Sequence, residues 1–363
     1  MKLIILIAGG RTGSGLLHSL FDGHEQVLQL PSEFYYDIFW KKAKHIKDRE
    51  KIADLFLKDY PAFFDSRINL QERHNQLGKK RNNYYKVDPD IFKKKLIRLL
   101  NNKKIKFLPL LFALHQAYNF SKHSKINYKK VLLLHLHHLH RLDIFKKYNF
   151  EIIYTVREPF ANITSSFNKI FNNKYDDKKN IFKSFQFMMD KILNCIHGLI
   201  KFNKKIYVIK LENLHKHKST LLKNLCKLLG IKFSKSLLKS TVNNLEWWGD
   251  SDSKKYLNGL NYKFKNNVNY KYFYKKDLTI LNYYLYNQLQ TYNYINKINN
   301  SYNIKNKNIE FMRFLPLKME IILFFKLFKE LKIKELLFSL RFLFKRFSNM
   351  RLEKINKKKI FIF

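Results

Sequence analysis

The amino-acid sequence predicts an α/β fold with three layers, in which helices cover both faces of a central parallel sheet and a helical extension follows at the C-terminus. Short aliphatic runs typical of buried parallel strands alternate along the chain with segments of helical periodicity. A glycine-rich turn joins the first of these runs to its helix. The runs that we interpret as strands are residues 3–8, 131–136, 151–156 and 206–211.

The first predicted strand follows Met1 closely, and its apolar run superficially resembles a signal peptide. The run is only six residues long and continues directly into glycines, so the small-residue cleavage region of a signal peptide is missing. We therefore expect a buried strand over residues 3–8. Apolar side chains then recur at helical spacing, which predicts that the glycine-rich turn opens a helix, at Leu16, Leu17, Leu20 and Phe21.

The turn between this strand and its helix has the composition of an anion-binding loop. Glycines let the backbone approach a phosphate, and the N–H groups and dipole at a helix start favour negative charge. Hydroxyl groups add donors, and an arginine adds a fixed positive charge. A nucleoside-triphosphate loop ends in Gly-Lys-Ser/Thr, whereas this turn ends in Gly15-Leu16-Leu17, which disfavours an ordinary kinase or ATPase. The candidate binding residues are Gly10, Arg11, Thr12, Gly13, Ser14 and Gly15.

A second candidate anion site follows the predicted strand at residues 151–156. This strand ends in Arg157, and Ser165 lies eight residues further on, two turns along a predicted helix. Parallel strands deliver the residues after their carboxyl ends to the ligand edge of a sheet, so this pair could bind a further phosphate. A surface arginine followed by Pro159 at a helix start would also explain Arg157 alone.

The remaining segments predict helical insertions and an extension. Residues 32–60 and 90–120 read as helical insertions that could line an acceptor cleft. We expect one domain over residues 1–295, a linker rich in Asn, Lys, Ser and Tyr over 296–310, and a basic amphipathic helical extension over 311–363. The mixture of basic and apolar residues at 311–348 fits either a helix on an anionic membrane surface or a helix packed on the protein.

Together these segments resemble the PAPS-dependent sulfotransferases, which use 3′-phosphoadenosine 5′-phosphosulfate (PAPS) as sulfuryl donor. Arg11 to Ser14 is similar to the family's loop of the type Pro-Arg-Ser-Gly-Thr-Thr, with Gly10 in place of the proline. Arg157 and Ser165 match the family's 3′-phosphate pair at its spacing, and residues 208–214 are close to its Val-Arg-Tyr-Glu-Asp-Leu strand and turn.

The resemblance covers about residues 1–295 and implies a P-loop-like sulfotransferase fold. It also implies that the loop binds the 5′-phosphosulfate of PAPS, that Arg157 and Ser165 bind the 3′-phosphate, and that Arg11 takes part in catalysis. The segment from Trp247 to Gly259 falls where the family places a loop that closes over the donor.

Two kinds of residue are candidates for the proton acceptor. His135 lies 22 residues before Arg157, as does the general-base histidine of the cytosolic members, although Leu133 stands where their Lys-Thr-His motif has lysine. The rival is Glu33, close to the place where Golgi-type members carry a catalytic glutamate, and an N-terminal role in a helix capped by Ser32 would also explain it. We favour His135, with His137 in reserve. Metal binding by the four histidines at 135–140 is disfavoured because no Glu or Cys completes a usual ligand set, so we expect no metal.

Composition adds weaker expectations. The formal net charge of +43 accompanies many Asn, Ile, Phe and Tyr residues, so drift in an A/T-rich genome explains the scattered lysines and we expect no nucleic-acid partner. Cys195 and Cys226 read as buried reduced thiols, which fits a cytoplasmic protein that could lie peripherally at the inner membrane surface. No run of ~18 apolar residues predicts a membrane-spanning helix.

The sequence therefore predicts an enzyme that transfers a sulfuryl group from PAPS to a hydroxyl group, with a glycan or glycolipid as the expected acceptor. Two alternatives stay open. One is a nucleotide-dependent kinase with an atypical phosphate-binding loop, and the other is a non-catalytic basic protein that binds glycans.

Overall fold

A computed structural model of the chain describes residues 1–101, 104–123, 128–172, 181–251, 256–257, 259–261, 264–266, 268–294, 311–312, 314–329, 355 and 359–363. The predicted linker at 296–310 and residues 330–348 of the extension lie outside these ranges.

A parallel sheet of six strands forms the centre of the molecule, in the order β2-β3-β1-β4-β5-β8. The four predicted strands are confirmed, and they are β1, β3, β4 and β5 of this sheet. The strand bounds are β1 Lys2–Ala8, β2 Val27–Leu28, β3 Val131–Leu136, β4 Glu151–Val156, β5 Ile206–Lys210 and β8 Ile360–Ile362, with a separate antiparallel pair β6 Thr241–Val242 and β7 Leu245–Glu246.

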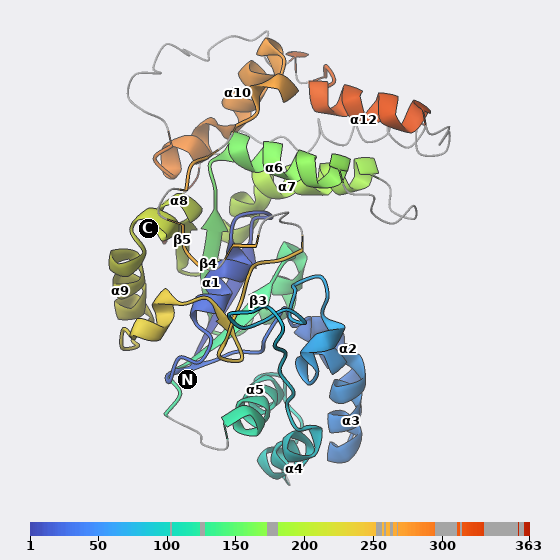
Figure 1. Cartoon of the computed structure of the whole chain (residues 1–363), viewed down its shortest axis with the longest axis vertical. Coiled ribbons are helices and arrows are strands. Elements are labelled where there is room, and N and C mark those ends of the chain that lie inside the picture. The colour runs from blue at the N-terminus through green and yellow to red at the C-terminus, as the bar shows by residue number, and fades with distance from the viewer. Residues whose placement is uncertain are drawn as a thin grey trace.

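Helices cover both faces of the sheet, which confirms the three-layer α/β architecture (Figure 1). Alternate residues of each strand enter different cores. Ile5 and Ile7 of β1 pack with α2 to α5, whereas Ile4 and Leu6 pack with α1 and α9. The helix bounds are α1 Ser14–Leu20, α2 Tyr36–Ala43, α3 Arg49–Asp59, α4 Pro89–Leu100, α5 Phe107–His123, α6 Pro159–Asn172, α7 Ile181–Ile200, α8 Leu211–Lys216, α9 Lys218–Leu229, α10 Lys275–Thr291 and α12 Lys318–Lys329, with short 3-10 turns η1 Pro61–Phe63, η2 Ser66–Ile68, η3 Leu139–Phe145, η4 Lys235–Leu238 and η5 Tyr270–Tyr272.

Local sequence signals fix several of these helices. Asp48 caps α3 and Asp88 caps α4, each accepting hydrogen bonds from backbone N–H groups of the first turn. Gly230 ends α9 in the left-handed conformation, which glycine adopts without steric cost. The insertions predicted at 32–60 and 90–120 contain α2, α3, α4 and most of α5.

A third core lies beyond the sheet, where α6, α7, α10 and α12 pack together. Leu323 and Leu327 of α12 are fully buried there, while Phe325 and Phe328 are exposed on the opposite side. The described part of the extension thus packs on the domain through one face. The membrane contact predicted for 311–348 stays a prediction. Among the described residues, none of the helices is long and apolar enough to cross a membrane.

The end of the chain corrects one expectation, because residues 360–362 are a strand and not part of a helical extension. Their sequence, Ile-Phe-Ile, has β-branched and aromatic side chains that favour a strand. The backbone of this segment pairs with the otherwise open edge of β5, through Ile206 to Val208. Sequence periodicity failed here because three residues are too few to show a period.

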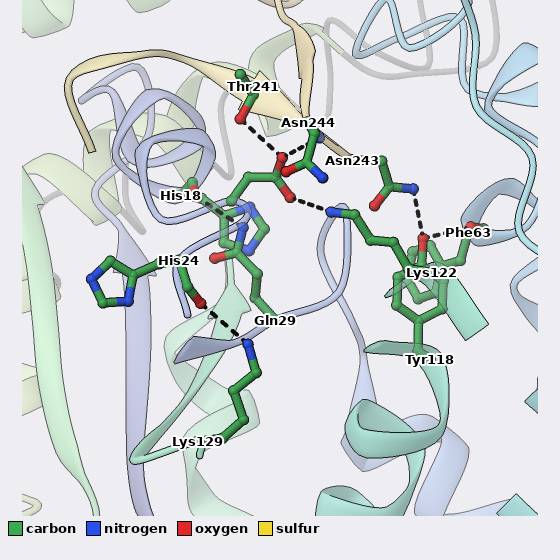
Figure 2. Close-up of polar contacts among 11 residues, drawn as sticks. His18, His24, Gln29, Phe63, Tyr118, Lys122, Lys129, Thr241, Asn243 and Asn244 are labelled. Carbon is green, nitrogen blue, oxygen red and sulfur yellow. Dashed lines mark hydrogen bonds and ion pairs between the residues drawn. The ribbon is translucent and has the colours of Figure 1, made fainter. Parts of the chain in front are cut away.

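A buried carboxylate ties the short β6–β7 hairpin to the main domain (Figure 2). Asp22, just after α1, accepts hydrogen bonds from Thr241 Oγ1 at 2.9 Å and from the backbone N–H of Asn244 at 2.7 Å, and it pairs with Lys122 Nζ of α5 at 2.9 Å. The chain then leads from the hairpin to Trp247, which covers the start of α1: a Cβ at Gly15 would lie 3.4 Å from its ring.

The two cysteines, Cys195 and Cys226, are buried free thiols, as predicted.

Candidate functional site

The glycine-rich turn between β1 and α1 has a compact left-handed conformation. Gly10 and Gly13 have φ angles of 75° and 81°, which suit glycine, and Arg11 also has a positive φ of 54°. If position 10 carried a side chain, its Cβ would lie 2.7 Å from Met188 of α7, and a Cβ at position 13 would clash with Leu211. The glycines therefore let this loop lie tightly between α7 and the end of β5.

The hydroxyl residues of the loop have different surroundings. Thr12 Oγ1 lies 2.8 Å from Thr155 Oγ1, so this hydroxyl ties the loop to the neighbouring strand β4. Ser14 is buried as the first residue of α1. The turn therefore lies at the carboxyl end of β1, between this strand and α1, and anion binding by it stays a prediction.

The second predicted anchor meets this loop in space. Parallel pairing places Ala8 of β1 beside Thr155 of β4, so the segments after both strands leave the sheet at the same edge. Arg11 Nε lies 3.5 Å from Ser165 Oγ of α6, although the two residues are 154 positions apart in the chain. The side chain of Arg157 donates from Nε to Asn266 Oδ1 at 3.4 Å.

Charges of the same sign gather at this junction. Burial lowers the pKa of Arg157, the carboxylate of Glu212 opposes this effect, and the nearby charge of Arg11 lowers the pKa further. Arg11 Nη1 lies 4.0 Å from Asp250 Oδ1, at the edge of ion-pairing range. Two guanidinium groups close to each other at one edge of a sheet favour the approach of an anion.

Glu212 organises the residues around Arg157. Its carboxylate accepts hydrogen bonds from the backbone N–H of Glu158 at 2.9 Å, from Asn266 Nδ2 at 2.8 Å and from the Tyr294 hydroxyl at 2.8 Å. Glu212 thereby orients the amide that receives the Arg157 hydrogen bond. The sequence motif around residues 208–214 included Glu212 without a role, and no pattern in the sequence indicated Asn266.

The three candidate proton acceptors form one cluster on the other side of the loop. The Glu33 carboxylate pairs with His137 Nδ1. His137 contacts His135 edge to face, with ring centroids 4.7 Å apart, and His135 stacks on His18 of α1 at 5.0 Å. The sequence presented Glu33 and His135 as rivals, but the fold places them in one chain of side chains.

The exposure of these groups differs. His135 is only 3% exposed, burial lowers its pKa well below the usual value, and its Nε2 has no hydrogen-bond partner among the described residues. Burial also raises the pKa of Glu33, but hydrogen bonds from His137 and Tyr35 outweigh this, so the net shift is downward. The His137 side chain is 38% exposed. Of the three, His137 is therefore the most accessible, with a carboxylate to orient its ring.

A cavity of about 230 Å³ lies beside this cluster, between the turn after β3 and helix α7. Its walls combine polar groups with one exposed aromatic ring, that of Phe187. Lys191 of α7 lines the cavity and reaches the glycine-rich turn at residues 10–15, which the sequence predicts as a phosphate loop. A Cβ on Gly10 would lie 3.7 Å from Lys191 Cδ. The lining residues are Ala8, His137, His138, Leu139, His140, Phe187, Asp190, Lys191, Asn194 and Cys195.

Sequence reasoning missed Lys191, although a signal for it exists. Phe187, Lys191 and Cys195 are spaced by four residues, so they share one face of α7, and Lys191 is the charged member of this apolar row. Among the described residues, no group of three or more His, Cys, Asp or Glu side chains is arranged to hold a metal ion, and the four histidines at 135–140 do not form one.

No protein-family model and no curated protein matches the chain. The solved structures that are similar to it in part include two sulfotransferase domains. The sulfotransferase domain from the Synechococcus PCC 7002 olefin synthase aligns at 15% sequence identity with a TM-score of 0.38, over 66% of this chain and 76% of that one. The sulfotransferase domain from the curacin biosynthetic pathway aligns at 15% identity with a TM-score of 0.38, over 75% of this chain and 90% of that one. No residue role is carried over from them.

Proposed function

We propose that the protein is a sulfotransferase that moves a sulfuryl group from PAPS to a hydroxyl group of an acceptor. The observation that carries this proposal is the meeting of Arg11, Ser165 and Arg157 at the ends of β1 and β4. PAPS carries two separate anionic groups, a 3′-phosphate and a 5′-phosphosulfate. In this proposal the loop with Arg11 would bind the 5′-phosphosulfate, and Arg157 with Ser165 would bind the 3′-phosphate.

The residues present fit such a ligand. The turn has positive φ angles at Gly10, Arg11 and Gly13, a backbone conformation of the kind that forms anion-binding loops, and Arg11 would supply positive charge where the leaving phosphate becomes more negative. Arg157 and Ser165 would hold the 3′-phosphate, with Asn266 orienting the guanidinium group. The repulsion between Arg11 and Arg157 would then be relieved by the phosphate groups between them.

Transfer requires the acceptor oxygen to bond to sulfur while the bond from sulfur to the 5′-phosphate oxygen breaks, with its electron pair staying on the phosphate. The acceptor hydroxyl must lose its proton in the same process. His137, oriented by Glu33, is the accessible base beside the loop, and His135 lies behind it. A carboxylate that fixes the ring of a histidine is a recurring arrangement for a general base.

The acceptor would enter through the cavity beside His137. Its polar walls and the exposed ring of Phe187 fit a hydroxyl-bearing sugar, whose hydroxyl groups need hydrogen-bond partners and whose apolar face packs on aromatic rings. At about 230 Å³ the cavity is smaller than the ~300 to 1,000 Å³ of typical small-molecule sites, so one sugar unit would enter it. A glycan or glycolipid therefore remains our expected acceptor.

A ligand series tests the donor. A ligand that binds the folded state stabilises it by RT ln(1 + [L]/Kd), about 2.7 kcal/mol at a hundredfold excess over Kd. We expect 3′-phosphoadenosine 5′-phosphate (PAP) to raise the melting temperature more than ADP or ATP does at equal concentration. If ATP with Mg²⁺ stabilises the protein more than PAP, the site is that of a kinase and this proposal is wrong.

A further inference from the structure

The donor site has a side that Arg11 and Arg157 do not reach. Strand β1 lies between β3 and β4, so the phosphate loop has two neighbours at the same edge of the sheet. The arginines and Ser165 lie on the β4 side. The candidate proton acceptors and the cavity lie on the β3 side, where the loop faces α7.

Lys191 is the cation on this second side. Its stem lies beside the loop at Gly10, and its Nζ lies 4.7 Å from the centre of the Phe187 ring. Within the part of the chain that the structure describes, no carboxylate lies within ion-pairing distance of the Lys191 ammonium group. Burying a lysine without a paired carboxylate costs free energy of folding, and a bound anion would supply the missing partner.

The positive charge of Lys191 acts on several side chains around the candidate proton acceptors. The charge of Lys191 contributes to lowering the pKa of Glu33, His135 and His138. Burial is the main cause of the lowered pKa of Lys191 itself, and Glu33 acts in the opposite direction. The lysine is therefore close to the residues that would deprotonate the acceptor.

We propose that Lys191 is a catalytic residue that binds the sulfuryl group of the donor, with its ammonium group on the non-bridging sulfuryl oxygens at the mouth of the cavity. This rests on the proposed function. If the 3′-phosphate binds Arg157 and the 5′-phosphate binds the loop, the sulfuryl group extends to the β3 side, towards the acceptor. Arg11 then stabilises the leaving phosphate, and Lys191 holds the group that is transferred. Neither cation takes up or releases a proton, since the acceptor's proton goes to the base.

The proposal is tested by comparing two ligands that differ only in the sulfuryl group, PAPS and PAP. Titration calorimetry without acceptor measures both affinities for the full chain. We expect Lys191→Met, which keeps the stem and removes the charge, to weaken PAPS binding by ~10- to 100-fold, the usual effect of losing a charge-assisted hydrogen bond. PAP binding should change by less than ~3-fold, and Lys191→Arg should bind PAPS close to the wild-type level.

Lys183→Met is the matched control, because Lys183 lies on the same helix but is exposed. It should bind both ligands like the wild-type protein. If Lys191→Met weakens PAPS and PAP equally, or neither, Lys191 does not contact the sulfuryl group and the inference is wrong. A wild-type protein that binds neither ligand would instead refute the proposed function.

A labelling experiment on the wild-type protein avoids any dependence on the folding of a variant. Acetic anhydride modifies accessible lysines, and mass spectrometry reports the extent at each position. We expect PAPS to protect Lys191 more than PAP does at saturating concentrations of both, with Lys183 labelled equally in the two samples. Equal protection of Lys191 by both ligands would overturn the assignment.

Discussion

Replacing Arg157 provides the sharpest test of how the donor is bound. The Arg157→Ala variant removes a guanidinium group that is largely enclosed and held by Asn266 at 3.4 Å. A charge-assisted hydrogen bond to a phosphate contributes ~1.5 to 3 kcal/mol, so PAP should bind ~10- to 100-fold more weakly. The loss should not exceed this range, because Arg11 remains close enough to attract the same phosphate.

The ligand-free variant should remain folded. Burial and the charge of Arg11 both oppose the charged form of Arg157, whereas Glu212 favours it. Losing this cation therefore removes a repulsion and a desolvation cost together with the attraction to Glu212. We therefore expect little change in the melting temperature without ligand. A weakened affinity then reports on the binding site and not on partial unfolding.

Adenosine 5′-phosphosulfate, which lacks the 3′-phosphate, is the matched ligand. Its affinity, measured by the same calorimetry, should be nearly unaffected by Arg157→Ala. Asn266→Ala should cause a smaller loss of PAP affinity, ~2- to 10-fold, since it removes only the hydrogen bond that orients the guanidinium group. Equal weakening of PAP and adenosine 5′-phosphosulfate by Arg157→Ala would show that Arg157 does not bind the 3′-phosphate.

Five further substitutions probe catalysis and stability. Arg11→Ala should lower the turnover number by ~100-fold or more while weakening PAP binding less, because its charge matters most as the leaving phosphate gains charge; normal turnover would exclude it from the catalytic centre. His137→Asn should lower turnover by ~100- to 10,000-fold with unchanged PAP affinity, and Glu33→Gln by less. If His135→Asn alone abolishes turnover, the buried ring is the base, as the sequence predicted. Asp22→Asn should lower the free energy of unfolding by ~3 kcal/mol at pH 7, measured with urea, because Lys122 loses its buried partner. The pKa of Asp22 is held below its ordinary value of 3.8, so its stabilisation is present above that pH and is lost as the pH falls through the lower folded value. The difference between wild type and Asp22→Asn should therefore shrink below pH 3.8.

The sequence predicted the frame of the molecule well because its central strands are continuous aliphatic runs. Residues 131–136 and 151–156 match β3 and β4 at both ends. Short strands with no period of their own were missed, such as Val27–Leu28 and Ile360–Ile362, because pairing with a longer neighbour defines them. The positions of the loop glycines and of Arg157 at the ends of β1 and β4 could be predicted because strand ends and turns have local signals.

The proton acceptors show what local signals omit. Glu33 and His137 are about a hundred residues apart in the chain, and only the parallel sheet brings their segments together. The interval of 22 residues between His135 and Arg157 indicates where the strand that contains His135 ends. It does not indicate on which face of the sheet the His135 ring lies. That ring stacks on His18 of α1, where burial suppresses its charged form.

Because the chain has so many lysines and arginines, its composition does not indicate which of them belong to the candidate site. Burial distinguishes Arg157 and Lys191 from the many exposed cations. A solvated lysine costs little wherever it arises, so a drift in composition can add many of them to the surface. A cation beside another cation in a partly buried site costs free energy that folding must supply from elsewhere. Arg157, close to the charge of Arg11, is in this position, and Lys191 is a partly buried cation beside the glycine-rich turn. Glu212 offsets part of this cost at Arg157, and under the proposed function the anionic groups of PAPS would offset the rest.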